Sequence, residues 1–285
     1  MTIQPGSLYL CATPIGNLED MTFRAIRVLK EAAVVAAEDT RHTRKLLTHF
    51  DIHSPLVSYH EHNKAVRGPE LIERLLKGDS VVVVSDAGMP GISDPGSHLV
   101  QLAIEADIPV IPLPGANAAL SALVCSGLDT TAFTFVGFLP KTTKKRREFI
   151  YSLAKLPTTL LFYESPHRLK DTLAELLTGF GDRQAVAARE LTKKFEQFVR
   201  GSLSGLQAHF NENLPRGEFT IVIAGNNNEQ AADIHHAGAA QLLPLDQAVQ
   251  ALVETGLDKK AAIREVALQR DIPKREVYQA VIGKE

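Results

Sequence analysis

Four consecutive valines, Val81 to Val84, constrain the fold of this chain more than any other segment. A strand with one face in water alternates apolar and polar residues, so this run predicts a strand buried on both faces, at the centre of a parallel sheet. The next residues, 85–96, are rich in Gly, Pro, Ser and Asp, which favours an irregular loop with exposed backbone groups. Because open α/β sheets bind ligands beyond the carboxyl ends of their strands, we predict a ligand-binding loop here. The alternative is a tight strand-to-helix turn.

Length and composition predict a globular enzyme with more than one domain. The 285 residues exceed the size at which a single hydrophobic core usually stops growing, and 45% apolar with 22% charged residues is ordinary for a soluble protein. No apolar run approaches the roughly 18 residues of a membrane span and no signal-peptide pattern opens the chain, so we expect a cytoplasmic location. With a net charge of -2, binding to nucleic acid would depend on local basic clusters.

The two cysteines, Cys11 and Cys125, are far apart in the sequence and both have apolar neighbours. This usage suits a reducing compartment and argues against a disulfide framework and against a zinc site. We therefore expect both cysteines to be structural, and we expect no bound metal.

Strands and helices alternate over residues 1–126, which we predict to form one α/β domain with a parallel sheet. Asp39 or Thr40 is expected to cap a short basic helix. The other expected helices cover 21–33, a stretch ending near residue 77, 97–106 and a stretch ending at residue 125. The expected strands cover 7–12, 34–37, 55–59, 81–84 and 110–113.

Residues 127–225 are predicted to form a second, less regular α/β domain. No helical pattern separates the strands between residues 184 and 200, so we expect a mixed, partly antiparallel sheet. Two helices are expected, at 166–177 and 202–210. The expected strands are 133–137, 159–163, 184–188, 195–200 and 219–224.

The polar, small-residue segment 226–243 is predicted to be a linker, and residues 244–285 a small helical domain. Its helices, joined around residues 271–273, resemble a helix-turn-helix. Nucleic-acid binding and a bracing role between domains or subunits are both open for this tail. Its candidate contacts are Arg264, Arg270, Lys274 and Arg275.

Three loops that follow separate strands, 13–17, 85–91 and 114–117, should converge at one edge of the first sheet and form a single cleft. The first loop lacks the G-x-G-x-x-G pattern of dinucleotide-binding folds, and no P-loop with its GK[ST] ending occurs. NAD and ATP are therefore disfavoured. A cofactor held by backbone groups and a few carboxylates, such as a cation that carries an adenine, remains open.

Six segments together resemble the ribosomal RNA small subunit methyltransferase I family, whose fold is that of the tetrapyrrole methylases. They are 12–20 (ATPIGNLED), 37–41 (AEDTR), 85–96 (SDAGMPGISDPG), 138–140 (FLP), 163–168 (YESPHR) and 189–193 (RELTK). The resemblance implies two α/β domains of the tetrapyrrole methylase type with the cofactor cleft between them, plus the small C-terminal helical, helix-turn-helix-like domain. It also implies S-adenosylmethionine as methyl donor, the 2'-hydroxyl of a cytidine in the decoding centre of 16S rRNA as acceptor, and a homodimer.

Carried over position by position, the resemblance implies cofactor contacts from all three loops and from the second domain. Many tetrapyrrole methylases have Gly-Asp-Pro after the third strand, and this chain departs from that pattern with Ser85-Asp86-Ala87. The implied cofactor residues are Pro14, Asp86, Ala87, Gly88, Pro90, Ile92, Asn117, Ala118, Tyr163, Glu164, Ala188 and Arg189.

Methyl transfer to a ribose hydroxyl requires the oxygen, the methyl carbon and the sulfur to be aligned, and a base or a nearby cation would help a weak nucleophile. Asp39 with Arg41, and Arg189 with Glu190, could instead form ion pairs that only stabilise the structure and take no part in catalysis. The catalytic candidates are Asp39, Arg41, Glu164, Glu190 and Lys193.

Two basic clusters are candidate phosphate contacts for RNA. For the cluster from Lys141 to Arg147, the alternative is the solvated start of a helix, although such a run of cations suits a helix N-terminus poorly. Phe138 or Tyr163 could stack on bases, with core packing the expected role of Phe138. The clusters are Arg41, Arg44 and Lys45, and Lys141, Lys144, Lys145, Arg146 and Arg147.

Two other functions compete with rRNA methylation. A methyltransferase of a small tetrapyrrole would need a wide apolar trough and would have no use for the Lys141–Arg147 cluster. A nucleic-acid-binding regulator would use the tail for recognition and the α/β part as a ligand sensor.

Overall fold

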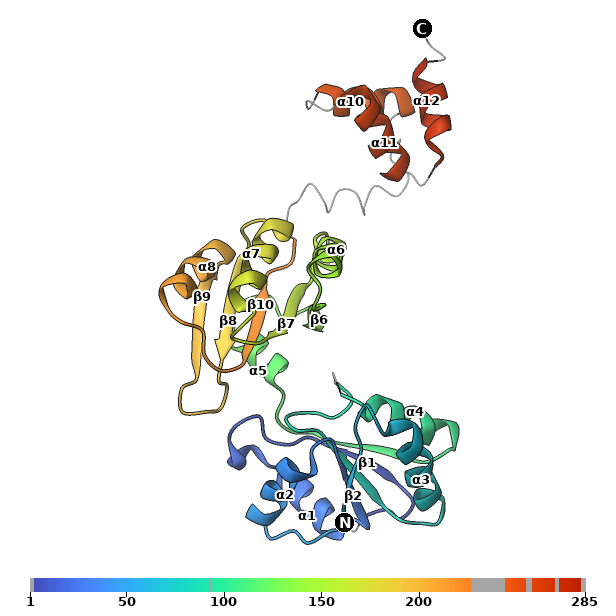
Figure 1. Cartoon of the computed structure of the whole chain (residues 1–285), viewed down its shortest axis with the longest axis vertical. Coiled ribbons are helices and arrows are strands. Elements are labelled where there is room, and N and C mark those ends of the chain that lie inside the picture. The colour runs from blue at the N-terminus through green and yellow to red at the C-terminus, as the bar shows by residue number, and fades with distance from the viewer. Residues whose placement is uncertain (1–2, 93, 227–243, 255–257, 270–271, 283–285) are drawn as a thin grey trace. The chain divides into compact units, whose positions relative to one another are not determined.

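The computed structural model describes residues 3–92, 94–226, 244–254, 258–269 and 272–282 (Figure 1). Their contacts divide the chain into two compact units, residues 1–227 and 228–285. Apart from Asn226, the predicted linker 226–243 lies outside the described residues. The predicted division between residues 126 and 127 falls inside the first unit and stays a prediction.

The first unit begins with a five-stranded parallel sheet in the order β3-β2-β4-β1-β5. The valine run forms its central strand β4, which confirms the prediction. Val82 and Val84 pack into the core on one face and Val81 and Val83 into the core on the other. The strands are β1 (Leu8–Cys11), β2 (Val34–Ala37), β3 (Leu56–Ser58), β4 (Val81–Val84) and β5 (Val110–Leu113).

Helices cover both faces of this sheet, as a parallel sheet with two buried faces requires. The core on one face includes residues of α1 and α2, and the core on the other includes residues of α3 and α4. The helices are η1 (Leu18–Asp20), α1 (Phe23–Glu31), α2 (Thr40–His49), α3 (Lys64–Leu76), α4 (Gly96–Glu105) and α5 (Ala118–Val124).

The second sheet is mixed, as predicted, with the order β6-β7-β10-β8-β9. Only β6 and β7 run parallel among its paired strands, and the remaining pairs are antiparallel. The strands are β6 (Phe133–Phe138), β7 (Thr159–Glu164), β8 (Gln184–Arg189), β9 (Gln197–Ser202) and β10 (Phe219–Ile223).

Helices α6 (Thr143–Leu153), α7 (Leu169–Phe180) and α8 (Leu203–Glu212) contribute to the core on one face of the second sheet. Helix α5, which follows the last strand of the first sheet, covers the other face with Ala119, Ala122 and Leu123. The chain thus passes from one sheet to the other through a helix that is packed on the second sheet.

Two expectations for this half were wrong. Helix α6 was not among the expected helices and entered only as the alternative of a helix start at Lys141–Arg147, because cations fill its first turn and few apolar residues mark its buried side. Strand β9 begins at Gln197 and not at Phe195, which is 66% exposed in the preceding loop.

One of the two cysteines differs from the expectation. Cys11 is buried, and burial raises the pKa of its thiol to about 12, which suits a structural role. Cys125 is exposed, because Ala122 and Leu123 take the buried positions in the last turn of α5.

The described part of the second unit contains α10 (Leu245–Glu254), α11 (Lys259–Gln269) and α12 (Lys274–Ile282), packed around a small apolar core. Arg264, Lys274 and Arg275 are exposed on it, whereas Arg270 lies outside the described residues. Within the described part of the chain, no helix has both the length and the apolar character to cross a lipid bilayer.

Candidate functional site

The loops after β1 and β4 are held together by their backbones at the carboxyl edge of the first sheet. Thr13 and Gly88 exchange two N–H to carbonyl hydrogen bonds, of 2.9 and 3.0 Å. The Thr13 hydroxyl donates to the Ser85 carbonyl at 3.2 Å, and the Ser85 hydroxyl donates back to the Gly88 carbonyl at 3.2 Å. Gly88 has φ +80°, a conformation in which a side chain is strained, so the glycine makes this close pairing possible.

Two aspartates shape the rest of the β4 loop. Asp94 accepts hydrogen bonds from the backbone N–H groups of Gly91 and Gly96, both at 2.8 Å, and so folds the loop back on itself. Asp86 accepts the N–H of Asp39 at 3.0 Å, which links the loop to the start of α2. In the third loop, the Asn117 side chain caps α5 by accepting the N–H of Leu120 at 2.9 Å.

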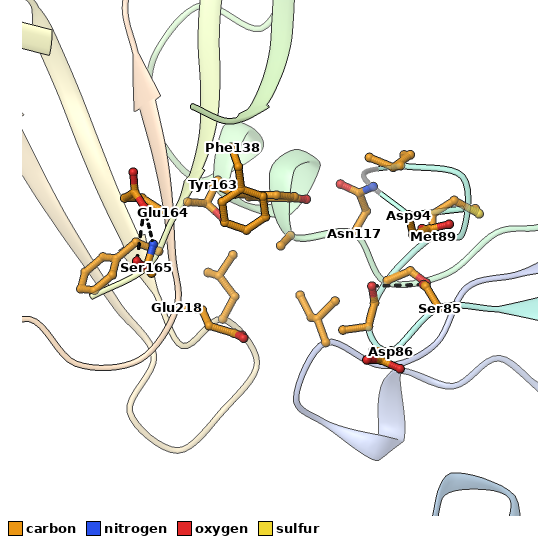
Figure 2. A pocket seen from close by; sticks show the side chains of 18 of the residues that line it. Ser85, Asp86, Met89, Asp94, Asn117, Phe138, Tyr163, Glu164, Ser165 and Glu218 are labelled. Carbon is orange, nitrogen blue, oxygen red and sulfur yellow. Dashed lines mark hydrogen bonds between the residues drawn. The ribbon is translucent and has the colours of Figure 1, made fainter. Parts of the chain in front are cut away.

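These three loops meet at one pocket of about 510 Å³, as the sequence predicted, and the second sheet supplies its opposite wall (Figure 2). A pocket of this size suits a small molecule or cofactor. The residues that line it are Ile15, Glu38, Ser85, Asp86, Ala87, Gly88, Met89, Ile92, Asp94, Asn117, Ala118, Phe138, Tyr163, Glu164, Ser165, Pro166, Glu190, Leu191, Lys193, Glu218, Phe219 and Thr220.

Eight of the twelve implied cofactor residues line this pocket: Asp86, Ala87, Gly88, Ile92, Asn117, Ala118, Tyr163 and Glu164. The other four do not. Pro14 belongs to the first loop and Pro90 to the second, Ala188 is fully buried beneath α5, and Arg189 lies at the end of β8 with its Nε atom buried.

Three carboxylates, Glu38, Asp86 and Asp94, give the first-sheet side of the pocket a negative character. Burial raises the pKa of Glu38, and the charges of Asp86 and Asp94 raise it further. Burial also raises the pKa of Asp94, against the backbone hydrogen bonds that it accepts from the loop. Sequence reasoning missed Glu38 and Asp94, although the position of Glu38 directly after β2 places it at the same sheet edge as Asp86.

Glu164 is 2% exposed and both of its carboxylate oxygens have partners. One oxygen accepts the N–H of Ser165 at 2.8 Å, and the other accepts the Thr172 hydroxyl at 2.7 Å and lies 3.4 Å from the Arg168 guanidinium. This carboxylate anchors the end of β7 to the start of α7, so it is a poor candidate for a catalytic base.

Glu190, Lys193 and Glu218 form a charged group on the second-sheet side of the pocket. The Lys193 ammonium lies 3.1 Å from Glu190 and 3.4 Å from Glu218. Burial alone would raise the pKa of Glu190, but the hydrogen bonds from Lys193 and from the Glu218 backbone outweigh it and lower that pKa. Burial likewise disfavours the charged form of Lys193 and would lower its pKa, but Glu190 and Glu218 outweigh this effect and raise the pKa. Glu190 and Lys193 are therefore both ionised at neutral pH.

The loop that carries this group is held in an unusual conformation. Glu190 and Thr192 have φ values of +51° and +67°, in the left-handed region that costs free energy in residues with side chains. The Lys193 stem packs on Gly16, where an added Cβ would lie 2.4 Å from the Lys193 Cγ atom. Gly16 therefore permits the close contact between the β1 loop and the loop that carries Lys193.

Asp39 and Arg41 form an ion pair at the start of α2 and do not line the pocket. Asp39 caps the helix by accepting the N–H of Arg41 at 2.8 Å, and its side-chain hydrogen bond from the Arg41 guanidinium holds the pKa of the carboxyl well below its usual range. This agrees with the structural alternative for the pair. In the described residues Glu190 pairs with Lys193 and not with Arg189.

The two basic clusters differ in how many of their cations are available. On α2, Arg41, Arg44, Lys45, Thr48 and His49 line a shallow hollow. Arg44 and Lys45 are exposed, and neither forms an ion pair with another residue that the structure describes.

The second cluster divides between solvent and the protein interior. Lys141, Lys144 and Lys145 are exposed. Arg146, proposed for RNA binding, is only 8% exposed and its guanidinium binds the Glu175 carboxylate of α7, with Nη2 and Oε1 3.0 Å apart. Arg147 lies 3.6 Å from the same carboxylate. Arg146 therefore fixes α6 to α7, and its burial and its pairing with Glu175, a residue remote in the sequence, argue against a contact with RNA.

Comparison with known proteins supplies the family. Residues 7–207 match the family model of the tetrapyrrole (corrin/porphyrin) methylases. The chain is 51% identical to the ribosomal RNA small subunit methyltransferase I of Halalkalibacterium halodurans, over 96% of this chain and 93% of the relative. It is 47% identical to the protein of that name from Bacillus subtilis, over 96% of this chain and 94% of the relative.

Solved structures agree on the fold. Uroporphyrin-III C-methyltransferase of Thermus thermophilus superposes with a TM-score of 0.55 at 24% identity, over 76% of this chain and 94% of that protein. A cobalt precorrin-4 methyltransferase superposes with a TM-score of 0.56 at 18% identity, over 77% of this chain and 95% of that protein. The chain is a methyltransferase with the tetrapyrrole methylase fold, and it belongs to the ribosomal RNA small subunit methyltransferase I family.

Proposed function

We propose that this chain transfers a methyl group from S-adenosylmethionine to the 2'-hydroxyl of a cytidine in the decoding centre of 16S rRNA. The observation that carries the proposal is the pocket shared by the two sheets, in a chain whose relatives are ribosomal RNA methyltransferases. Its carboxylates suit a sulfonium cofactor, and the exposed cations of α2 and α6 suit RNA.

The methyl donor occupies the pocket between Asp86 and Tyr163. S-adenosylmethionine carries a sulfonium and an ammonium against one carboxylate, so the carboxylates of Glu38, Asp86 and Asp94 favour it electrostatically. Tyr163 and the backbone of the Ala87–Gly88 loop contact the uncharged parts of the cofactor. Pro14, Pro90, Ala188 and Arg189 shape the surrounding loops without reaching it.

In the reaction the ribose oxygen bonds to the methyl carbon, the carbon–sulfur bond breaks, and the hydroxyl proton leaves for a base. The Lys193 ammonium stabilises the negative charge that develops on the oxygen, and the ionised Glu190 beside it receives the proton. Glu164 and Asp39 position other groups, because both oxygens of each accept hydrogen bonds, whereas the hydrogen bonds that Glu190 accepts from described residues involve one oxygen, Oε1.

The RNA backbone contacts exposed cations on two helices. On α2 these include Arg44 and Lys45, with Arg41 89% exposed beside them, and on α6 they include Lys144 and Lys145. Such cations provide the sequence-independent part of RNA affinity.

A homodimer in the cytoplasm completes the proposal. The family resemblance implies the dimer, and the apolar side chains of Leu120 and Val124, exposed on α5, are available for a subunit contact. Sedimentation at micromolar protein concentration distinguishes a dimer from a monomer.

A methyl-transfer assay with labelled S-adenosylmethionine tests the proposed function. We expect methyl incorporation into small ribosomal subunits or bare 16S rRNA that lack the modification, at the 2'-oxygen of one cytidine, and none into uroporphyrinogen. Incorporation into uroporphyrinogen alone would establish a tetrapyrrole methyltransferase. Binding of RNA without any methyl transfer would favour a regulator.

A further inference from the structure

The sequence favoured a core position for Phe138, but the structure places it at the edge of the pocket. Its side chain is 58% exposed and is one of the pocket-lining residues. The Phe138 ring lies 5.6 Å from the ring of Tyr163, centroid to centroid (Figure 2). The Tyr163 ring in turn lies 5.1 Å from that of Phe135. A large exposed apolar ring at a pocket is unfavourable in the free protein and becomes favourable when a ligand covers it.

A β-bulge directs Phe138 to this position. Phe135 pairs with Leu161 across β6 and β7, but Gly137 pairs with Phe162, so Val136 is an extra residue. If residues 135–138 alternated regularly, with Val136 inside the strand pattern and no bulge, Phe138 would lie on the opposite face of the sheet, towards the core under α6 and α7. Gly137 has φ +71°, a backbone conformation that residues with side chains rarely adopt.

The residues after Phe138 connect the ring to a group of exposed lysines. Arg168 donates a hydrogen bond to the Leu139 carbonyl at 3.1 Å, which fixes the turn that follows the strand. The chain then reaches Lys141, Lys144 and Lys145, all exposed and without an ion pair among the described residues. An exposed ring followed by phosphate-binding cations is the arrangement with which proteins hold single-stranded RNA.

We infer that Phe138 is the stacking platform for the base of the acceptor nucleotide, which must leave the RNA stack so that its ribose can reach the pocket. This rests on the proposed function and adds a positioning residue to it. The alternative occupant of the ring is the adenine of S-adenosylmethionine. The exposure of Phe138, against the greater burial of Tyr163 beside it, favours the RNA base for Phe138 and the cofactor for Tyr163.

The test compares Phe138→Ala, Phe138→Leu and Phe138→Trp, with Phe133→Ala as the matched control. Phe133 lies at the other end of the same strand, is 43% exposed and does not line the pocket. Each protein is assayed for kcat and KM with unmodified small subunits, for S-adenosylmethionine affinity by calorimetry, and for its thermal midpoint.

We expect Phe138→Ala and Phe138→Leu to lower kcat/KM for the subunit about 5- to 150-fold, the range measured for loss of one base–aromatic stack. Phe138→Trp should retain activity, because tryptophan also stacks. S-adenosylmethionine affinity should stay within about twofold, and Phe133→Ala should behave as the parent in every assay.

Three outcomes overturn the inference. If Phe138→Ala lost as much affinity for S-adenosylmethionine as it lost in kcat/KM for the subunit, the ring would be assigned to the cofactor. Full activity of Phe138→Leu would show that only apolar contact is needed, and full activity of Phe138→Ala would remove any role. A parent protein that methylates no RNA would instead contradict the proposed function, which keeps the two failures distinct.

Discussion

At the scale of single residues, the site contains carboxylates whose ionised forms destabilise the folded protein unless a cation binds near them. Glu38 is the clearest case, since burial and the charges of Asp86 and Asp94 raise its pKa. Its ionised form therefore lowers the stability of the empty protein. The same charge should favour a sulfonium cofactor.

Glu38→Gln should consequently stabilise the free protein and weaken the binding of its cofactor. At pH 7 we expect the thermal midpoint to rise by about 1 to 4 °C. The gain should disappear below the ordinary glutamate pKa of 4.5, because Glu38 is then protonated in both the folded and the unfolded state. The affinity for S-adenosylmethionine should fall about tenfold.

Glu105→Gln, at the exposed end of α4, is the control for Glu38→Gln and should change neither quantity. A Glu38→Gln variant that is less stable than the parent at pH 7 would contradict the charge repulsion described here.

Lys193 is the second residue whose charge matters, and its partners Glu190 and Glu218 keep it protonated. Lys193→Ala should lower kcat about 10²- to 10³-fold, as loss of a charge-stabilising donor does, with little change in KM for the cofactor. Single-turnover methyl transfer measures this directly. Lys194→Ala, one residue along and exposed, is the control, and an equal loss in both variants would refute the assignment.

At the scale of elements, helix α6 has two faces with separate tasks. Arg146 turns inward to Glu175, whereas Lys144 and Lys145 face solvent. Arg146→Ala should destabilise the fold by about 3 kcal/mol, the usual effect of removing one partner from a buried ion pair. Chemical denaturation checks this value.

Lys144→Ala with Lys145→Ala should leave stability almost unchanged and weaken RNA binding. For every phosphate that the protein no longer neutralises, the slope of log affinity against log salt should become shallower by about 0.7 for single-stranded RNA. A double variant with the parental slope would mean that these lysines are only solvated, and would move the RNA path to Arg44 and Lys45 on α2.

The elements also show what the sequence can and cannot predict. The valine run of β4, the loop after it and the meeting of three loops followed from patterns within short segments, because burial and turn chemistry are local properties. The pairing of Arg146 with Glu175 could not be predicted, since it joins two helices that are distant in the sequence and no local pattern marks it. The bulge at Val136 moves the Phe138 side chain to the other face of β6, and the alternation of residues along a strand does not predict where a bulge occurs.

At the scale of the whole molecule, the first unit brings two sheets to one pocket, with Asp86 on one side and Lys193 on the other. The two sheets contribute different charged groups to the pocket. In the function that we propose, the negatively charged loops of the first sheet and Tyr163 of the second bind the methyl donor, while Lys193, Glu190 and Phe138 of the second sheet act on the acceptor.

Calorimetric titration of the parent protein and of Gly88→Val with S-adenosylmethionine tests this central claim most directly. Gly88 has φ +80° and pairs with Thr13, so a β-branched residue there should disrupt the loop while the buried strand β4 and the fold persist. We expect the parent to bind one cofactor per chain and the variant to show no binding at a similar thermal midpoint. A parent that does not bind S-adenosylmethionine, or a folded Gly88→Val variant with parental affinity, would contradict the claim that this pocket holds the methyl donor.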